Sequence, residues 1–140
     1  MEIIQTKTDI GLIRDKNEDV VSATEHPRNK NLKLLIAADG MGGKDKGDIA
    51  ANYVVSSLNR WFYNKDIKTL NDTEKVDQLL PRYIKTLNTN LIKKYGEDTL
   101  GTTLTLALIT RKKTLILNIG DSRTYIYKKK KLIQITEDDS

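Results

Sequence analysis

The chain has 140 residues, a formal net charge of +5 and no cysteine. This length allows one domain with a hydrophobic core, and we treat residues 1–140 as a single domain. The lack of cysteine excludes a disulfide framework, a thiolate zinc site and a cysteine nucleophile. No apolar run reaches the roughly 20 residues needed to cross a bilayer. Because no signal-peptide pattern is present either, we expect a cytoplasmic protein without a membrane partner.

The first forty residues predict three strands. Residues 2–9 alternate loosely between apolar and polar side chains, and residues 20–24 form a second short apolar run. A segment rich in turn-forming residues follows at 26–31. Residues 32–38 are apolar enough to predict a strand that is buried on both faces.

Two helices are predicted in the middle of the chain. Residues 47–63 carry apolar side chains on one helical face, and residues 73–95 repeat that spacing over a longer stretch. We expect a polar connection at 64–72 between them. Pro81 falls inside the second pattern, where a proline costs about 3 kcal/mol. It therefore predicts either a kink or a fresh helix start near Leu80.

The remaining sequence predicts strands at 102–110, 114–119, 124–127 and 132–135, joined by short turns. Sequential strands with short turns are typical of an antiparallel meander. Strands, then two helices, then strands predict an α+β fold in which antiparallel sheets are flanked by two long helices.

The positive charge is spread along the chain, and its densest run is Lys128 to Lys131. This run falls at the expected turn between the last two strands, which is typical of a solvated turn. Few aromatic residues lie nearby to stack on bases. We therefore predict no nucleic-acid partner.

The segment 37–43 is the strongest functional pattern. It places Asp39 at the end of a buried strand, and three glycines follow within four residues. A carboxylate in that position is costly unless it is paired or holds a metal, and glycines let backbone atoms approach an ion closely. The residues alone leave two alternatives open: a metal or phosphate site, or a strand-to-helix turn with a capping Asp.

Three further motifs accompany this segment. Residues 11–19 contain Arg14, Glu18 and Asp19, residues 101–103 read Gly-Thr-Thr, and residues 120–123 read Gly-Asp-Ser-Arg. The guanidinium of Arg14 suits a phosphate dianion. The first motif is not a calcium-binding hand, because its sixth and twelfth positions lack the required Gly and Glu.

In this order the four motifs resemble those of the metal-dependent serine/threonine protein phosphatases of type 2C, particularly the bacterial branch. The resemblance implies that Asp39 bridges two Mn²⁺ or Mg²⁺ ions and that the Gly40 carbonyl binds one of them. It implies that Glu18 holds a metal-bound water, that Arg14 binds the substrate phosphate, and that Asp121 contributes to a third metal site. Two or three ions are then expected in the complete site.

The implied reaction is the dephosphorylation of phosphoserine and phosphothreonine proteins by metal-activated hydroxide, in opposition to a serine/threonine kinase. Met41 stands where some family members carry a His that protonates the leaving group, so water takes that role. We expect no catalytic role for His26, the only histidine.

The chain covers only the first half of such a domain, and the second half normally supplies two more metal-binding aspartates. The resemblance thus implies half of an α-β-β-α sandwich. The chain is then a fragment, a natural truncation that assembles with another chain, or a non-catalytic relative. The alternative function is a catalytically incomplete regulatory or binding module. Exposed edge strands predict self-association.

Overall fold

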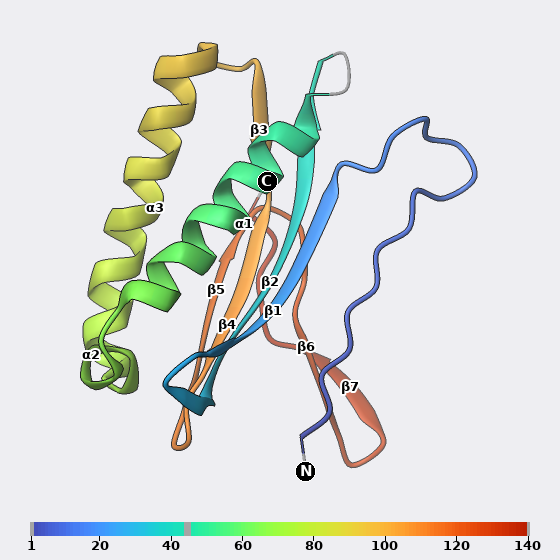
Figure 1. Ribbon diagram of the computed structural model, residues 1–140. Coiled ribbons are helices and arrows are strands. Elements are labelled where there is room, and N and C mark those ends of the chain that lie inside the picture. Colours follow the sequence, from blue (N-terminus) through green and yellow to red (C-terminus); the bar gives the residue numbers. More distant parts are fainter. Residues whose placement is uncertain (1, 44–45, 140) are drawn as a thin grey trace.

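The computed structural model describes residues 2–43 and 46–139, and it shows two long helices packed on one face of an antiparallel sheet (Figure 1). The predicted α+β class is confirmed. The helices are α1 (Gly47–Asn64), α2 (Ile67–Asn71) and α3 (Thr73–Tyr95), and the strands are β1 (Asp19–His26), β2 (Asn29–Gly42), β3 (Leu100–Thr102), β4 (Leu104–Ile109), β5 (Thr114–Ile119), β6 (Tyr125–Lys128) and β7 (Lys131–Gln134).

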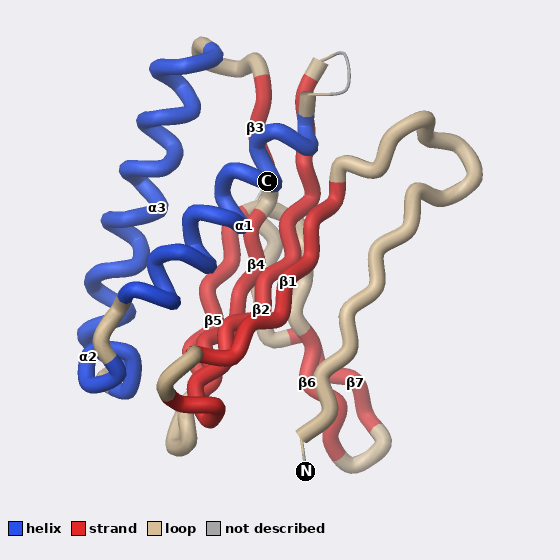
Figure 2. Tube along the Cα trace, in the orientation of Figure 1, coloured by secondary structure: helices blue, strands red, loops and turns tan. Residues whose placement is uncertain are grey.

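The main sheet has the strand order β1-β2-β4-β5, and β3 pairs with the far end of β2. All of these pairs are antiparallel. The last two strands, β6 and β7, form a separate hairpin that lies apart from the main sheet (Figure 2). The predicted meander is therefore divided into two hairpins, β4–β5 and β6–β7, by the turn at 120–124.

The core lies between the sheet and the helices. Alternating residues of β2 and β4 point toward α1 and α3, as expected for strands with one covered face. The buried apolar side chains are Leu32, Leu34, Ile36 and Ala38 of β2, Leu104, Leu106 and Leu108 of β4, Ala50, Ala51, Val54, Val55, Leu58 and Phe62 of α1, Leu70 of α2, and Val76, Leu80, Leu87 and Leu91 of α3.

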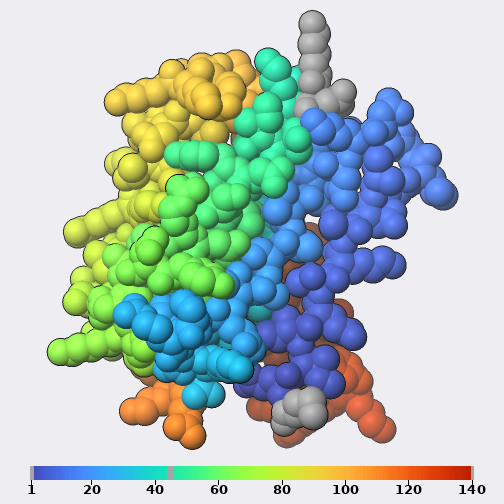
Figure 3. Space-filling model, viewed as in Figure 1, coloured from blue at the N-terminus to red at the C-terminus, as the bar shows by residue number. Residues whose placement is uncertain are grey.

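The opposite face of β2 is only half-buried, so the expectation of burial on both faces holds for one face alone. Leu35 and Ala37 lie there, beside a hollow of about 390 Å³ that residues 4–7 also line. The predicted strand at 2–9 is wrong, because residues 2–10 form no strand. Alternation alone does not make a strand when no neighbouring strand pairs with it. Figure 3 shows this segment in blue along the β1 side of the molecule.

Three other local predictions need correction. The polar connection at 64–72 contains the short helix α2, which Asp66 caps by accepting a hydrogen bond from the Thr69 N–H at 2.8 Å. Of the two alternatives at Pro81, the fresh helix start near Leu80 is wrong, because α3 runs unbroken through Pro81. The strand predicted at 102–110 is interrupted at Thr103, which separates β3 from β4.

No helix within residues 2–43 and 46–139 combines the length and the apolar character that crossing a membrane requires.

Candidate metal centre

Asp39 lies where β2 changes its partner strand. Up to Ala37 the strand pairs with β4, and from Gly40 onward it pairs with β3. At this break Thr103 holds both backbone groups of Asp39. The Asp39 N–H donates to Thr103 Oγ1 at 2.9 Å, and the Thr103 N–H donates to the Asp39 carbonyl at 2.9 Å. The backbone of Asp39 is therefore fixed, while its side chain is exposed at the end of the sheet.

Several carboxylates gather around Asp39. Asp19 is its direct partner across the β1–β2 pair. Partial burial raises the pKa of Asp39 above its usual value, and the negative charges of Asp19, Asp121 and Glu18 raise it further. Such a concentration of hard oxygen donors favours a bound dication, which would relieve the repulsion. These residues therefore supply oxygen ligands of the kind that Mn²⁺ or Mg²⁺ prefers.

Gly40 allows the start of α1 to approach β2 closely. A Cβ atom on Gly40 would collide with the backbone of Gly47 and would lie 2.6 Å from the Glu18 carbonyl. The Gly40 N–H donates to that same carbonyl at 3.2 Å. Only a glycine at this position permits the three backbone segments to meet.

Glu18 reaches across to the first turn of α1. Its Oε1 accepts a hydrogen bond of 2.7 Å from the Gly47 N–H. Lys46, the residue before the helix, makes no side-chain capping bond. The Glu18 carboxylate therefore takes the place of the usual N-cap side chain and compensates the positive end of the helix dipole.

Arg14 lies on the exposed loop that precedes β1. It lines a hollow of about 220 Å³ together with Glu18, Asp39 and Gly40. The structure thus brings four of the five predicted site residues around one hollow, which both basic and acidic residues line. Asp19 also lines this hollow, as do neighbouring residues of the loop.

Asp121, the fifth predicted residue, belongs to the turn between β5 and β6 and does not line that hollow. Its charge nevertheless acts on Asp39. The next residue, Ser122, lines a second hollow of about 310 Å³ on which Asp19 and Asp39 also lie. Asp39 therefore stands between the hollow of Arg14 and the turn that carries Asp121.

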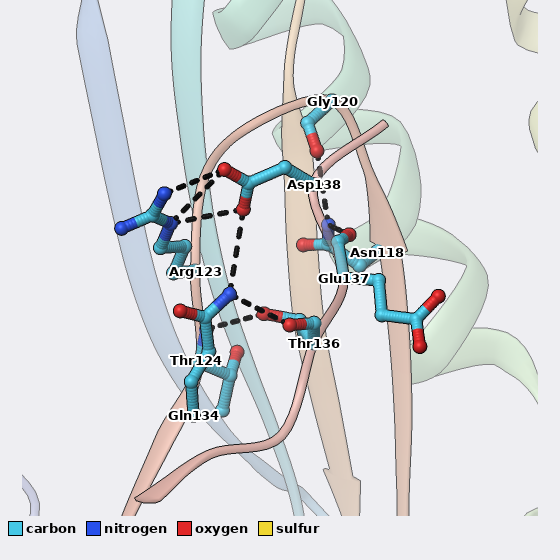
Figure 4. Close-up of polar contacts among 8 residues, drawn as sticks. All are labelled: Asn118, Gly120, Arg123, Thr124, Gln134, Thr136, Glu137 and Asp138. Carbon is cyan, nitrogen blue, oxygen red and sulfur yellow. Dashed lines mark hydrogen bonds and ion pairs between the residues drawn. The ribbon is translucent and has the colours of Figure 1, made fainter. Parts of the chain in front are cut away.

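The segment 134–139 holds this turn in place (Figure 4). Arg123 forms a two-pronged ion pair with Asp138, with its shortest contact from Nη2 to Oδ2 at 2.6 Å. The Gly120 carbonyl accepts hydrogen bonds from the Asp139 N–H at 2.9 Å and from the Asn118 amide at 3.1 Å. The Gln134 Nε2 donates a further hydrogen bond to Asp138 Oδ1 at 3.4 Å.

Within residues 2–43 and 46–139, no three carboxylate or imidazole side chains come close enough together to form a metal-ligand set of their own. Asp39 and its neighbours thus provide a partial set. His26 lies at the far end of β1, fully buried, with its ring against Phe62 and its Nε2 3.2 Å from the Lys65 carbonyl.

Sequence reasoning did not identify the polar links around Asp39. Thr103 belongs to the Gly-Thr-Thr motif, but its two bonds to the Asp39 backbone were not foreseen. The contacts of Glu18 with α1 and of Asp138 with Arg123 were also missed. A helix start without Ser, Thr, Asp or Asn before it is one signal that a distant side chain supplies the cap.

The model of the family described as protein phosphatase 2C matches residues 15–140. The chain belongs to the protein phosphatase 2C family. Like the resemblance in the four motifs, the match covers nearly the whole chain. It includes Glu18, Asp39, Gly40 and Asp121 but begins one residue after Arg14.

Two bacterial phosphatases are among the curated relatives. The chain is 35% identical over 140 residues to the serine/threonine phosphatase stp of Listeria welshimeri, covering 96% of this chain and 53% of that protein. It is 32% identical to the serine/threonine protein phosphatase PstP of Mycobacterium tuberculosis, covering 96% of this chain and 24% of that protein. The chain therefore spans about half the length of the Listeria relative.

Solved structures of protein phosphatase 2C relatives share the fold. The serine/threonine phosphatase Stp1 from Staphylococcus aureus superposes with a TM-score of 0.83 at 33% identity, covering 94% of this chain and 52% of that chain. The catalytic domain of PstP, crystallised in complex with two manganese ions, gives a TM-score of 0.73 at 31% identity, covering 96% of this chain and 54% of that chain.

Proposed function

We propose that this chain supplies about half of a Mn²⁺-dependent protein phosphatase domain that acts on phosphoserine and phosphothreonine proteins. The observation that carries the proposal is the grouping of Arg14, Glu18, Asp39 and Gly40 around one hollow. The family match and the manganese ions in the PstP structure support it. In the cell we expect Mn²⁺ or Mg²⁺, two or three ions, and cytoplasmic phosphoproteins that a serine/threonine kinase has modified.

In this proposal the acidic residues of the chain bind the metal ions, and the basic residue binds the substrate phosphate. Asp39 provides the carboxylate that would hold the cations, with the Gly40 carbonyl and a water on Glu18 completing part of the coordination. The Arg14 guanidinium binds the phosphate oxygens through parallel hydrogen bonds and offsets their charge as the bond to the leaving group breaks. When bound, the metal lowers the pKa of water so that hydroxide is available near neutral pH.

Further protein is needed to complete the site. The described residues offer only a partial ligand set, and affinity for a hard dication depends on the number and charge of its ligands. The β6–β7 hairpin also leaves large apolar side chains exposed, including Tyr127 at 72% and Leu132 at 66%. We infer that the missing aspartates and the cover for this hairpin come together, from more protein of the same fold or from a second copy of this chain.

A second function, a catalytically incomplete regulatory or binding module, is favoured by the same partial ligand set. The two functions differ in one measurable property. A phosphatase turns over phosphate esters when Mn²⁺ is present, whereas a module that has only the Asp39 cluster binds the metal or phosphate without turnover.

The deciding experiment measures Mn²⁺-dependent hydrolysis of p-nitrophenyl phosphate by the 140-residue chain. Asp39→Asn and Arg14→Ala are tested beside it, and Arg28→Ala at the β1–β2 turn serves as a matched control for loss of an exposed arginine. Metal-dependent turnover that Asp39→Asn abolishes and Arg28→Ala preserves would support the phosphatase. A folded chain without turnover would mean either a half-domain that lacks its complement or the incomplete module, and turnover gained on adding the rest of the domain would identify the half-domain. Light scattering on the same samples shows whether activity accompanies self-association.

A further inference from the structure

Thr103 is a buried polar residue that contacts the backbone of Asp39. It is 3% exposed and separates β3 from β4. Its N–H and its hydroxyl both bond to the backbone of Asp39, as described above. Its neighbour Thr102 adds a third bond, from Oγ1 to the Asp39 carbonyl at 3.1 Å. Asp39 therefore takes its backbone position from this short segment.

The same Thr103 side chain also contacts the turn that carries Asp121. Thr103 Oγ1 lies 2.6 Å from the Ser122 hydroxyl, a short hydrogen bond in which either oxygen can donate. Gly120 packs against the Thr103 methyl group so closely that an added Cβ would lie 2.8 Å from Cγ2. Gly120 also adopts a φ of +93°, which favours glycine. The turn therefore contacts Thr103 directly, through the Ser122 hydroxyl and the Gly120 backbone.

We propose that Thr103 is a positioning residue that fixes the Asp39 carboxylate and the Asp121 turn relative to each other. The inference rests on the proposed metal site, because Asp39 and Asp121 need a fixed relative position only if both contribute to binding the metal. A side chain that supports metal ligands contributes to affinity by holding them in the productive geometry. Thr103 hydrogen-bonds both to Asp39 on β2 and to Ser122 in the 120–123 turn.

The chemistry of threonine suits this position. Its hydroxyl oxygen accepts from the Asp39 N–H and still shares a hydrogen with Ser122, while its methyl group fills the space beneath Gly120. Valine has nearly the same shape but would leave the Asp39 N–H without its acceptor. Serine keeps both hydrogen bonds and loses only the methyl contact. The two substitutions therefore separate hydrogen bonding from packing.

The test is a Mn²⁺ titration of the whole ¹⁵N-labelled chain, in which bound Mn²⁺ broadens the amide signals of residues near it. In the wild-type chain the signals of Asp39 and Asp121 should broaden over one range of Mn²⁺ concentration. In Thr103→Val we expect that range to rise by about 10- to 100-fold, as for loss of other groups that support ligands. Thr103→Ser should remain close to wild type. Wild-type behaviour of a folded Thr103→Val chain would overturn the proposal.

A metal-free measurement separates this inference from the proposed function. Thr103→Val should speed hydrogen exchange at the Asp39 amide by about tenfold, the factor expected for one ordinary hydrogen bond. The Leu87 amide in α3 reports any change in global stability. Unchanged exchange at Asp39 overturns the positioning role, whether or not Mn²⁺ binds. A wild-type chain without site-selective broadening counts against the metal site alone.

Ser122→Ala provides a second variant if Thr103→Val fails to fold. It removes the bond to the turn and leaves the acceptor of the Asp39 N–H in place. We expect the Asp121 signal to require more Mn²⁺, while hydrogen exchange at Asp39 stays as in wild type. If the Mn²⁺ concentration needed to broaden the signals rose equally for Asp39 and Asp121, or for neither, the proposed link through Thr103 would be contradicted.

Discussion

The Glu18 carboxylate accepts a hydrogen bond of 2.7 Å from the backbone N–H of Gly47, which lies 29 residues later in the chain. The contact joins the loop that carries Arg14 to the first turn of α1. It also places the partial positive charge of the helix end beside the acidic cluster. One carboxylate therefore orders the loop, caps the helix and lines the hollow in which we place the metal.

Loss of this cap should destabilise the chain. We expect Glu18→Ala to lower the free energy of unfolding by about 1–2 kcal/mol, because the Gly47 N–H loses its acceptor and α1 loses a favourable charge. Glu18→Gln retains an acceptor oxygen and should cost only about 0.5 kcal/mol. Urea unfolding followed by circular dichroism measures both. Glu25→Ala, which removes an exposed glutamate of β1, is the control. An equal loss of unfolding free energy in this variant would refute a specific cap.

The approach of β2 to α1 predicts a second effect. Gly40→Ala should destabilise the chain by about 3 kcal/mol or prevent folding, because its new methyl group would meet backbone atoms that cannot rotate away. Gly43→Ala introduces the same methyl group where nothing lies within 4 Å, and it should change stability by less than about 0.5 kcal/mol. Thermal unfolding of the two variants compares them directly. Similar melting temperatures would show that β2 and α1 can move apart.

The sequence predicted the elements well where one local pattern decides them. Helical spacing located α3 over its full length, and apolar runs located β2 and β5. Predictions failed where the outcome depends on a distant partner. Residues 2–9 alternate like a strand but have no strand beside them, and Pro81 remains in a helix because the residues on both sides pack on the core.

The same distinction applies to the candidate site. The residue types near Asp39 could be read from motifs, because a carboxylate at a strand end and the glycines after it are local features. The polar links that fix the site could not. Thr103 lies 64 residues from Asp39, and Ser122 lies 19 residues further on. No spacing rule connects such positions until the break in β2 pairing brings them together.

The Arg123–Asp138 ion pair predicts a response to acid. Its hydrogen bonds from Arg123 lower the pKa of Asp138 below its ordinary value. Because this pKa is lowered, the ion pair contributes its full stabilisation at pH values above the ordinary carboxyl pKa. That stabilisation is lost as the pH falls through the lowered pKa. The 120–123 turn should then loosen in acid, with faster hydrogen exchange at the Asp139 amide, which bonds to Gly120.

Asp138→Asn should produce this loosening at neutral pH and remove its dependence on acid. Glu137→Gln, which removes a charge from the same segment without altering the ion pair, is the matched control. Because both partners are exposed, we expect the effect to be local to the turn. A global loss of stability, or exchange at Asp139 that does not respond to Asp138→Asn, would contradict a local clamp.

The acidic surroundings of Asp39 predict opposite effects of one substitution with and without metal. The pKa of Asp39 is raised, so its contribution to stability is present below the ordinary carboxyl value and is lost as the pH rises through the raised one. Without metal, Asp39→Asn should therefore stabilise the chain at neutral pH. We expect less than about 1 kcal/mol, because the exposed side chain is screened by solvent.

With Mn²⁺ the order should reverse. A tenfold excess over the dissociation constant stabilises a binding-competent chain by about 1.4 kcal/mol, and Asp39→Asn should lose that gain. The gain should also shrink in acid, because protons compete with the metal for the carboxylates. Melting curves of both chains at neutral and acidic pH, with EDTA or Mn²⁺, measure all three effects. Equal Mn²⁺ stabilisation of wild type and Asp39→Asn would place the metal away from Asp39.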